Sequence, residues 1–235
     1  MTTPRIRFFL PSLLLAAGIA AAGHFVGEGI ADRQNGKRTI SVKGLSEKEV
    51  AASIAIWNIG FHATGNELTE LSRKLGDSTK AVVIFLKQAG FDEQEVAIQP
   101  PGVSDMHMEV RGNDTPPPPE RFSAQQSVLL RTSKVDLVKP ALASVSSLMM
   151  AGVLISGYSQ PSYIFNQLNE IKPGMIREAT HAGRVAAEQF SRDSQTVLGK
   201  LRSASQGFFQ IEDRDAATPE RKIVRVVVNV EYEVN

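Results

Sequence analysis

The 235-residue chain contains no cysteine. It therefore has no disulfide, no thiolate zinc site, no iron–sulfur cluster, no cysteine nucleophile and no acylated N-terminal cysteine. Excess charge is also lacking. Residues 1–30 carry Arg5, Arg7 and Glu28, and subtracting these from 26 basic and 25 acidic residues leaves 24 of each in residues 31–235. A neutral body argues against nucleic acid as a partner, because binding driven by charge needs a basic patch.

Short motifs of known reactive sites are absent as well. The sequence has no G-x-S-x-G elbow, no H-E-x-x-H zinc motif, no Walker A loop and no G-x-G-x-x-G turn. Ser147 and Ser156 lie near apolar segments, but neither has an obvious histidine partner in the sequence. We therefore predict a protein without enzymatic activity, with no catalytic residue and no bound cofactor.

The N-terminus carries the longest apolar run. Arg5 and Arg7 precede an uncharged segment, residues 8–26, whose 19 residues would span roughly 28 Å as a helix, close to the ~30 Å bilayer core. Basic residues before the run place the N-terminus in the cytoplasm and the body outside. We expect residues 1–30 to form a signal anchor in the inner membrane, with the start of a short linker (residues 27–38) before a periplasmic body.

Cleavage is the alternative for this segment. Ala20-Ala21-Ala22 followed by Gly23 satisfies the small-x-small rule for signal peptidase sites. Cutting near Ala22 would leave a soluble periplasmic protein. The apolar run continues past that point into Phe25 and Val26, which favours a retained anchor. Both interpretations export the body.

Hydropathy patterns in residues 39–235 predict a series of strands. An apolar segment starting at Ile40 breaks at residues 44–48, and residues 50–61 then form a strand with apolar residues on both faces, which is typical of a central strand. Residues 122–131 alternate as a half-exposed strand, and residues 221–234 place a row of valines on one face. Because the strands of residues 122–131 and from Ile223 onward could be sheet edges, they could pair between copies in a homo-oligomer.

Three main helices are predicted between these strands. The first follows Thr64 and ends at Gly90, the second runs from Ser133 to Ala151 with Pro140 inside it, and the longest covers residues 170–198. The residues predicted to face inward on the longest helix are Ile171, Met175, Ala179, Ala182, Val185, Ala186 and Phe190. Segregated strands and helices of this kind indicate an α+β fold.

One short segment has the residue types of a metal site. Asp105, His107 and Glu109 alternate, so in an extended chain they share a face and offer oxygen and nitrogen donors. Met106 and Met108 would point the other way. No second ligand segment has a recognisable spacing, so we favour a solvated strand face over a metal site.

Several stretches in a consistent order carry a family resemblance. They are Ile40–Gly44, Val50–Phe61, Phe85–Phe91, Val128–Arg131 followed by Val135-Asp136, Arg177–Glu188 followed by Leu198-Gly199, and the valine-rich C-terminal strand. Together they resemble the SIMPL-domain family of bacterial envelope proteins, which includes periplasmic immunogenic and oxidative-stress-defence proteins. The Trp57-Asn58-Ile59 and Pro161–Phe165 stretches and the predicted anchor depart from the pattern and indicate a membrane-anchored branch.

The resemblance implies a single SIMPL-type α+β domain over residues 39–235. Such a domain has antiparallel or mixed sheets packed with three main helices, here preceded by one N-terminal transmembrane helix. It also implies export and a loose link to oxidative or envelope stress, and the family offers no established catalytic residues. Its small-molecule ligand is unknown.

Three functions compete on these observations. The leading hypothesis is a non-catalytic, membrane-tethered periplasmic module that self-associates. The second is a hydrolase that uses an acid/base pair such as Asp105 and His107. The third is a metal- or oxidant-binding protein that uses Met106, His107 and Met108.

Overall fold

The structure is a computed structural model that describes residues 17–20, 22–24, 38–109, 116, 118–156 and 160–235. Of the predicted anchor, residues 8–26, only 17–20 and 22–24 are described, and these are helical and exposed. The rest of the anchor lies outside the described residues. In the described part of the chain, no helix combines the length and apolar character needed to span a membrane. The anchor stays a prediction.

The chain forms two compact units. Unit 1 comprises the described residues of Met1–Leu45, together with Glu178–Gly207 and Val227–Asn235, and unit 2 comprises those of Ser46–Arg177 and Phe208–Val226. Each strand pairing with an assigned register is antiparallel. Strands and helices follow one another in separate runs rather than in strict alternation. The predicted α+β class with antiparallel sheets is confirmed.

Unit 2 contains a sheet built around the pair β2 (Ile54–Gly65) and β5 (Phe122–Thr132). The two strands stay in register from Ala55 opposite Thr132 to Gly65 opposite Phe122. Beyond β5 lie β3 (Val96–Ile98) and β4 (Gly102–Asp105), and beyond β2 lie β6 (Leu154–Ile155) and β7 (Ser162–Ile164). The central strand predicted within residues 50–61 is therefore confirmed as β2.

The break before β2 was predicted at the wrong place. Strand β1 (Thr39–Ala51) runs through residues 44–48 without interruption. The chain leaves it at Ala52 and Ser53, whose amides donate to the carbonyls of Glu220 at 2.8 Å and Ile164 at 2.9 Å. Because these bonds tie the two residues to a loop and to β7, the chain passes here from one sheet to the other.

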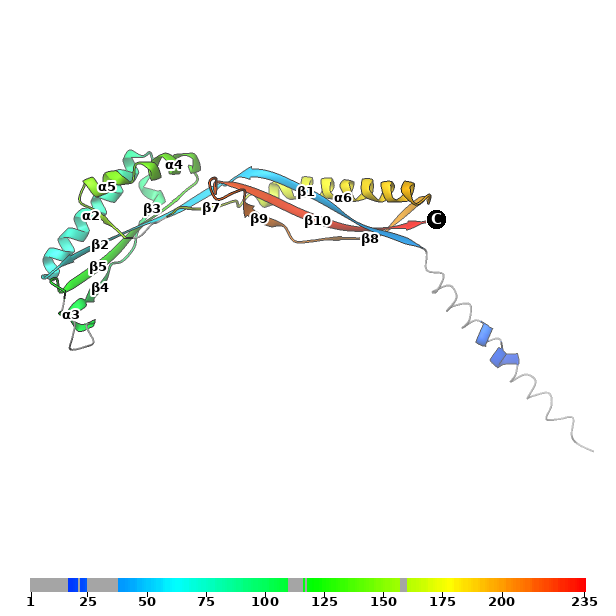
Figure 1. The fold of residues 1–235 in the computed structure, drawn as a ribbon, viewed down its shortest axis with the longest axis horizontal. Coiled ribbons are helices and arrows are strands. Elements are labelled where there is room, and N and C mark those ends of the chain that lie inside the picture. The colour runs from blue at the N-terminus through cyan, green and yellow to red at the C-terminus, as the bar shows by residue number, and fades with distance from the viewer. Residues whose placement is uncertain (1–16, 21, 25–37, 110–115, 117, 157–159) are drawn as a thin grey trace, which may run out of the picture. The chain divides into compact units, whose positions relative to one another are not determined.

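Helix α2 (Leu68–Gln88) lies along one face of the unit 2 sheet (Figure 1). The predicted helix is confirmed, and it ends beside Gly90, whose φ of +96° is the left-handed geometry that favours glycine. The buried side chains at its interface with β2 are Trp57, Ile59, Phe61, Leu71, Leu75, Val82, Phe85 and Leu86. Burial of each large apolar side chain stabilises the fold by about 1.5–3 kcal/mol.

The second predicted helix is broken in two. Its first part is α4 (Val135–Ala143) and its second α5 (Ser146–Met150). Pro140 has no N–H to donate within α4, which weakens the helix at this point. Ser144 then closes α4: its amide donates to the carbonyls of Pro140 and Ala141, and its hydroxyl donates to the carbonyl of Ala141 at 2.9 Å.

The second sheet has β10 (Arg221–Val234) as its interior strand. Strand β1 pairs with one side of β10, and β8 (Leu198–Gln206) and β9 (Gln210–Asp213) pair with the other. The buried residues of β10 alternate along its length, as predicted, and are Lys222, Val224, Val226, Val228, Val230, Tyr232 and Val234.

The prediction that residues 122–131 and the strand from Ile223 onward are sheet edges was wrong for both strands. Strand β5 is paired on one side with β2 and on the other with β3 and β4. Strand β10 likewise has partners on both sides. In the described part of unit 1, the outer strands of the sheet are β1 and β8. Any strand-mediated association of this sheet would therefore use a different strand from those proposed.

The longest helix, α6 (Leu168–Asp193), packs through residues spaced four apart. Its buried residues are Met175, Ala179, Gly183, Ala187 and Ser191. Val185 and Phe190, predicted to face inward, are 46% and 60% exposed. The contact follows one i±4 row, which is inclined to the helix axis, so a stripe drawn with 3.6-residue periodicity diverges from it.

Glycine explains how closely α6 approaches the sheet within unit 1. A Cβ on Gly44 of β1 would lie 1.8 Å from the carbonyl oxygen of Ala179 and 2.5 Å from the amide nitrogen of Gly183. A Cβ on Gly183 would lie 2.7 Å from Cγ2 of Val230. Since no larger residue fits at this crossing, Gly44 marks helix contact and not the strand break predicted there.

Candidate functional site

Asp105 and His107 are brought together by a turn rather than by a strand. Asp105 ends β4, and residues 106–109 form the short helix α3 (Met106–Glu109). The His107 amide donates to Oδ1 of Asp105 at 3.1 Å, and His107 Nε2 contacts the carbonyl oxygen of Pro118 at 2.9 Å. Arg121 donates to Oδ2 of Asp105 from Nε at 2.9 Å and pairs with it through Nη2 at 2.8 Å.

These contacts give the segment a structural role. The hydrogen bond from Arg121, with help from the His107 amide, holds the pKa of Asp105 below its usual value. Because the carboxylate and the imidazole are both occupied, they hold α3 against the chain on either side of it. This is an anchored turn with its ionised carboxylate already paired.

The extended geometry assumed for the metal site was wrong. Residues two apart share a face in a strand but not in a helix, so α3 removes the alignment of Asp105, His107 and Glu109. Of these, the Glu109 side chain lies outside the described residues. Among the side chains that are described, no group of three His, Asp or Glu could hold a metal ion. Met108 is 79% exposed.

A histidine–serine contact appears where the sequence suggested none. His62 of β2 and Ser156, just after β6, place Nδ1 and Oγ 3.2 Å apart in a half-buried setting. They are 94 residues apart in the chain and meet because β6 pairs with β2 through Phe61 and His62. The expectation that Ser156 has no histidine partner was therefore wrong.

Beside this pair lies a polar cleft with a volume of about 430 Å³. Its walls come from four separate segments of unit 2: β2, α2, Glu120 two residues before β5, and the α5–β6 turn with the first residue of β6. The lining residues are His62, Ala63, Thr64, Lys74, Asp77, Ser78, Glu120, Ala151, Gly152 and Leu154. We refer to it below as the β2–α2 cleft.

Charges of both signs line the β2–α2 cleft. Lys74 Nζ donates to the carbonyl oxygen of Thr64 at 3.1 Å and pairs with Glu70 at 3.2 Å. Asp77 pairs with Arg73 at 3.2 Å and with Lys80 at 3.9 Å. Glu120, which also lines the cleft, is half-buried. The cleft therefore offers one ammonium and two carboxylates in a partly enclosed space.

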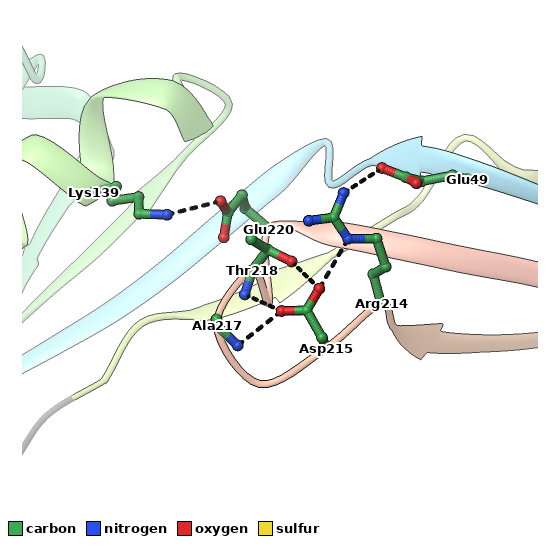
Figure 2. A network of polar contacts seen from close by, with 7 residues as sticks. All are labelled: Glu49, Lys139, Arg214, Asp215, Ala217, Thr218 and Glu220. Atoms are coloured by element: carbon green, nitrogen blue, oxygen red, sulfur yellow. Dashed lines mark hydrogen bonds and ion pairs between the residues drawn. The ribbon is translucent and has the colours of Figure 1, made fainter.

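A second polar network, also in unit 2, fastens the loop between β9 and β10 (Figure 2). Arg214 donates to Glu49 of β1 and to Asp215, both at 2.9 Å, and Glu220 pairs with Lys139 of α4 at 3.3 Å. Asp215 accepts bonds from the amides of Ala217 and Thr218 and from the Thr218 hydroxyl.

The network strongly stabilises one ionised carboxylate. Hydrogen bonds from the Thr218 hydroxyl, and next from Arg214, lower the pKa of Asp215 to about 2. Burial, and next the charge of Glu220, raise the pKa of Tyr163 on β7. Arg214, Asp215 and Glu220 each have a partner within the network, so the arrangement braces the loop.

A family model matches residues 40–232. Its description is SIMPL, a protein of unknown function (DUF541). The chain belongs to the SIMPL family. The resemblance inferred from the order of fold-forming stretches is thereby confirmed, and the SIMPL match includes both the β2–α2 cleft and the anchored turn at Asp105.

Other comparisons with the SIMPL chain add little. No curated protein matches the sequence. Two crystal structures, each described as a hydrolase from Listeria innocua, share 12% and 11% identity with it, and both alignments cover 81% of this chain and 92% of the other. Both have a TM-score of 0.22. Similarity at that level supports no inference about the SIMPL domain described here.

The β2–α2 cleft of the SIMPL domain was not predicted from the sequence. Its charged residues come from α2 and from the end of a proline-rich stretch, and its histidine lies on a strand between apolar neighbours. No pair of them has a spacing that a motif would record. Only the pairing of β6 with β2 and the packing of α2 bring them together.

Proposed function

We propose that this SIMPL-domain protein is a non-catalytic periplasmic module. Residues 8–26 anchor it in the inner membrane, and the module acts by associating with other copies of itself. Through its family it takes part in envelope or oxidative stress defence. The uncharged run behind Arg5 and Arg7 supports the anchor, and the absence of the short motifs of known reactive sites from the sequence supports a role in binding.

One observation carries the self-association. Strand β8 is an outer strand of its sheet, with β10 as its partner among the described residues, and its residues 200–206 are all exposed. An outer strand presents unpaired backbone N–H and C=O groups that can pair with an identical strand. Leu201 within β8 is 50% exposed and Val197 just before it is 70% exposed. Antiparallel pairing of two β8 strands would cover this apolar surface around a two-fold axis.

The anchored turn supports the non-catalytic assignment over the hydrolase alternative. A general base needs an accessible atom within hydrogen-bond reach of its substrate. Here the Asp105 carboxylate pairs with Arg121, and His107 Nε2 contacts a backbone carbonyl. The alternative is tested by an activity screen: turnover that is lost in His107→Ala would overturn the non-catalytic proposal.

The absence of cysteine makes self-association directly testable. A disulfide between two copies needs Cα atoms within about 7 Å, so the cysteine must lie near the two-fold axis. In membranes that contain the full chain, one of the single substitutions Leu201→Cys, Ser203→Cys and Ser205→Cys along β8 should therefore form a disulfide-linked dimer after mild oxidation, visible on a non-reducing gel. Val103→Cys is the matched control, because Val103 is 55% exposed and lies on β4 of the other sheet. Dimer yields from all three β8 variants no higher than that of the control would refute pairing through β8.

The anchor has its own test. The mass of the protein recovered from the membrane fraction should correspond to the full chain. A mass that lacks the residues up to Ala22 would replace the anchor with the cleavage alternative, while full-length protein in the cytosol would overturn export itself.

A further inference from the structure

The β2–α2 cleft lies beyond the point where β6 stops, and no described strand pairs with that side of β2 past His62. β6 pairs with β2 at Phe61 and His62, and the Ser156 amide donates to the carbonyl of Gly60 at 2.8 Å. Backbone groups of residues two apart on a strand point to the same side. Thr64 therefore directs its N–H and C=O toward the side that β6 occupies earlier in the strand, and this side borders the cleft.

Lys74 is held at this open edge. Its ammonium donates to the Thr64 carbonyl at 3.1 Å, and the bond fixes a positive charge next to the Thr64 N–H. Its salt bridge with Glu70 is partly exposed, with 40% and 50% of the two side chains accessible. An exposed pair of this kind stabilises by only about 0–1 kcal/mol, so the carboxylate of a ligand can readily replace Glu70 as the partner of Lys74. An ammonium beside a backbone N–H is a suitable site for a ligand carboxylate.

Negative charge also lines the cleft. Glu120 is half-buried, and none of the described residues forms a salt bridge with its carboxylate. Asp77 adds a second carboxylate, shared with Arg73 and Lys80. A half-buried carboxylate without a close cation gains energy when a ligand supplies one. Ala63, Ala151 and Leu154 also line the cleft and suit small apolar groups.

We propose that the β2–α2 cleft binds a short zwitterionic peptide of about two residues. The ligand's carboxylate pairs with Lys74 and the Thr64 N–H, and its free amino group pairs with Glu120 and Asp77. The volume of about 430 Å³ lies in the lower part of the range for small-molecule sites, ~300–1,000 Å³. This inference is independent of self-association, because the cleft and β8 share no residue.

Calorimetry on the full chain in detergent tests the proposal with three probes: Ala-Ala, N-acetyl-Ala-Ala and Ala-Ala amide. The free dipeptide should bind, and blocking either end should weaken binding at least tenfold, because each block removes one charge. Lys74→Met and Glu120→Gln should each weaken Ala-Ala binding by a similar factor. Lys87→Met and Glu93→Gln are the matched controls, since these two residues pair with each other at 3.0 Å and lie outside the cleft.

Each outcome decides the proposal. No measurable heat from Ala-Ala at millimolar concentration would overturn it, as would equal affinities for the free and blocked peptides. Equal affinity of Lys74→Met and Lys87→Met would overturn the site even if the peptide binds. Leu201→Lys, which targets β8, should leave the affinity unchanged, so failure of self-association and failure of the cleft are distinguishable.

Discussion

Replacing Gly44 by alanine probes the closest approach of helix to strand within unit 1. The new Cβ would meet three backbone atoms: the oxygen and carbon of Ala179 at 1.8 and 2.9 Å, and the nitrogen of Gly183 at 2.5 Å. Backbone atoms inside a helix cannot rotate away as a side chain can. The clash is relieved only if α6 and β1 separate.

The size of the effect follows from that separation. Restoring an ordinary contact of about 3.5 Å from 1.8 Å requires a displacement of roughly 1.7 Å. A gap of even ~0.5–1 Å forfeits a quarter to a half of the dispersion attraction across an interface. Overpacking typically costs about 1–3 kcal/mol, and more where the surroundings are rigid. We therefore expect a loss of about 3 kcal/mol or more, which lowers Tm by about 6–12 °C in a domain of this size.

Thermal unfolding followed by circular dichroism measures this loss. Gly76→Ala is the matched control, because Gly76 lies inside α2 and a Cβ there meets no atom within 4 Å. Alanine in a helix interior should raise stability there by about 0.5–1 kcal/mol. If Gly44→Ala melts within about 1 °C of the unaltered chain, the close packing of α6 on β1 is refuted.

Further predictions concern the core and the loop network. Phe61→Ala, which removes a fully buried side chain, should lower the free energy of unfolding by about 3–5 kcal/mol in denaturant unfolding. Phe190→Ala should change it by less than about 0.5 kcal/mol, because Phe190 is 60% exposed. Equal losses in the two variants would contradict the assigned buried face of α6. The pKa of Asp215 is lowered from 3.8 to about 2, so its ionised form stabilises the fold above pH 4 and this contribution disappears as the pH falls through 2. Asp215→Asn should therefore be less stable than the unaltered chain at pH 5, and the difference should shrink as the pH falls and vanish only below pH 2 in urea unfolding. A difference that stays constant with pH would show that the carboxylate is not the stabilising group.

Much of the local structure was predictable because apolar residues recur with the period of a strand or of a helix. The alternating valines of β10, the apolar row of α2 and the glycine that ends this helix each depend on residues close together in the sequence. The order of these elements was sufficient to indicate the SIMPL family. Strand and helix periods are properties of the backbone, so they appear in the sequence before any tertiary contact forms.

Predictions failed where a local pattern fits two geometries. Residues 105–109 alternate donors as a strand face would, yet the strand ends at Asp105, which pairs with Arg121, and residues 106–109 form α3. The second helix was predicted to continue to Ala151, and Pro140 with the Ser144 hydrogen bonds split it. In each case the deciding contact is a hydrogen bond or ion pair whose partner the pattern does not specify.

The sequence by itself determined the composition of the body, the type of most elements and the family, because these follow from residue periodicity and order. Only the tertiary structure decided which strands are outer strands, which row of α6 is buried, and that His62, Lys74 and Glu120 surround one cleft. These features depend on strand pairing and helix packing between residues far apart in the chain. Hydropathy periods carry no information about such partners, because the same alternation suits an interior strand and an outer one.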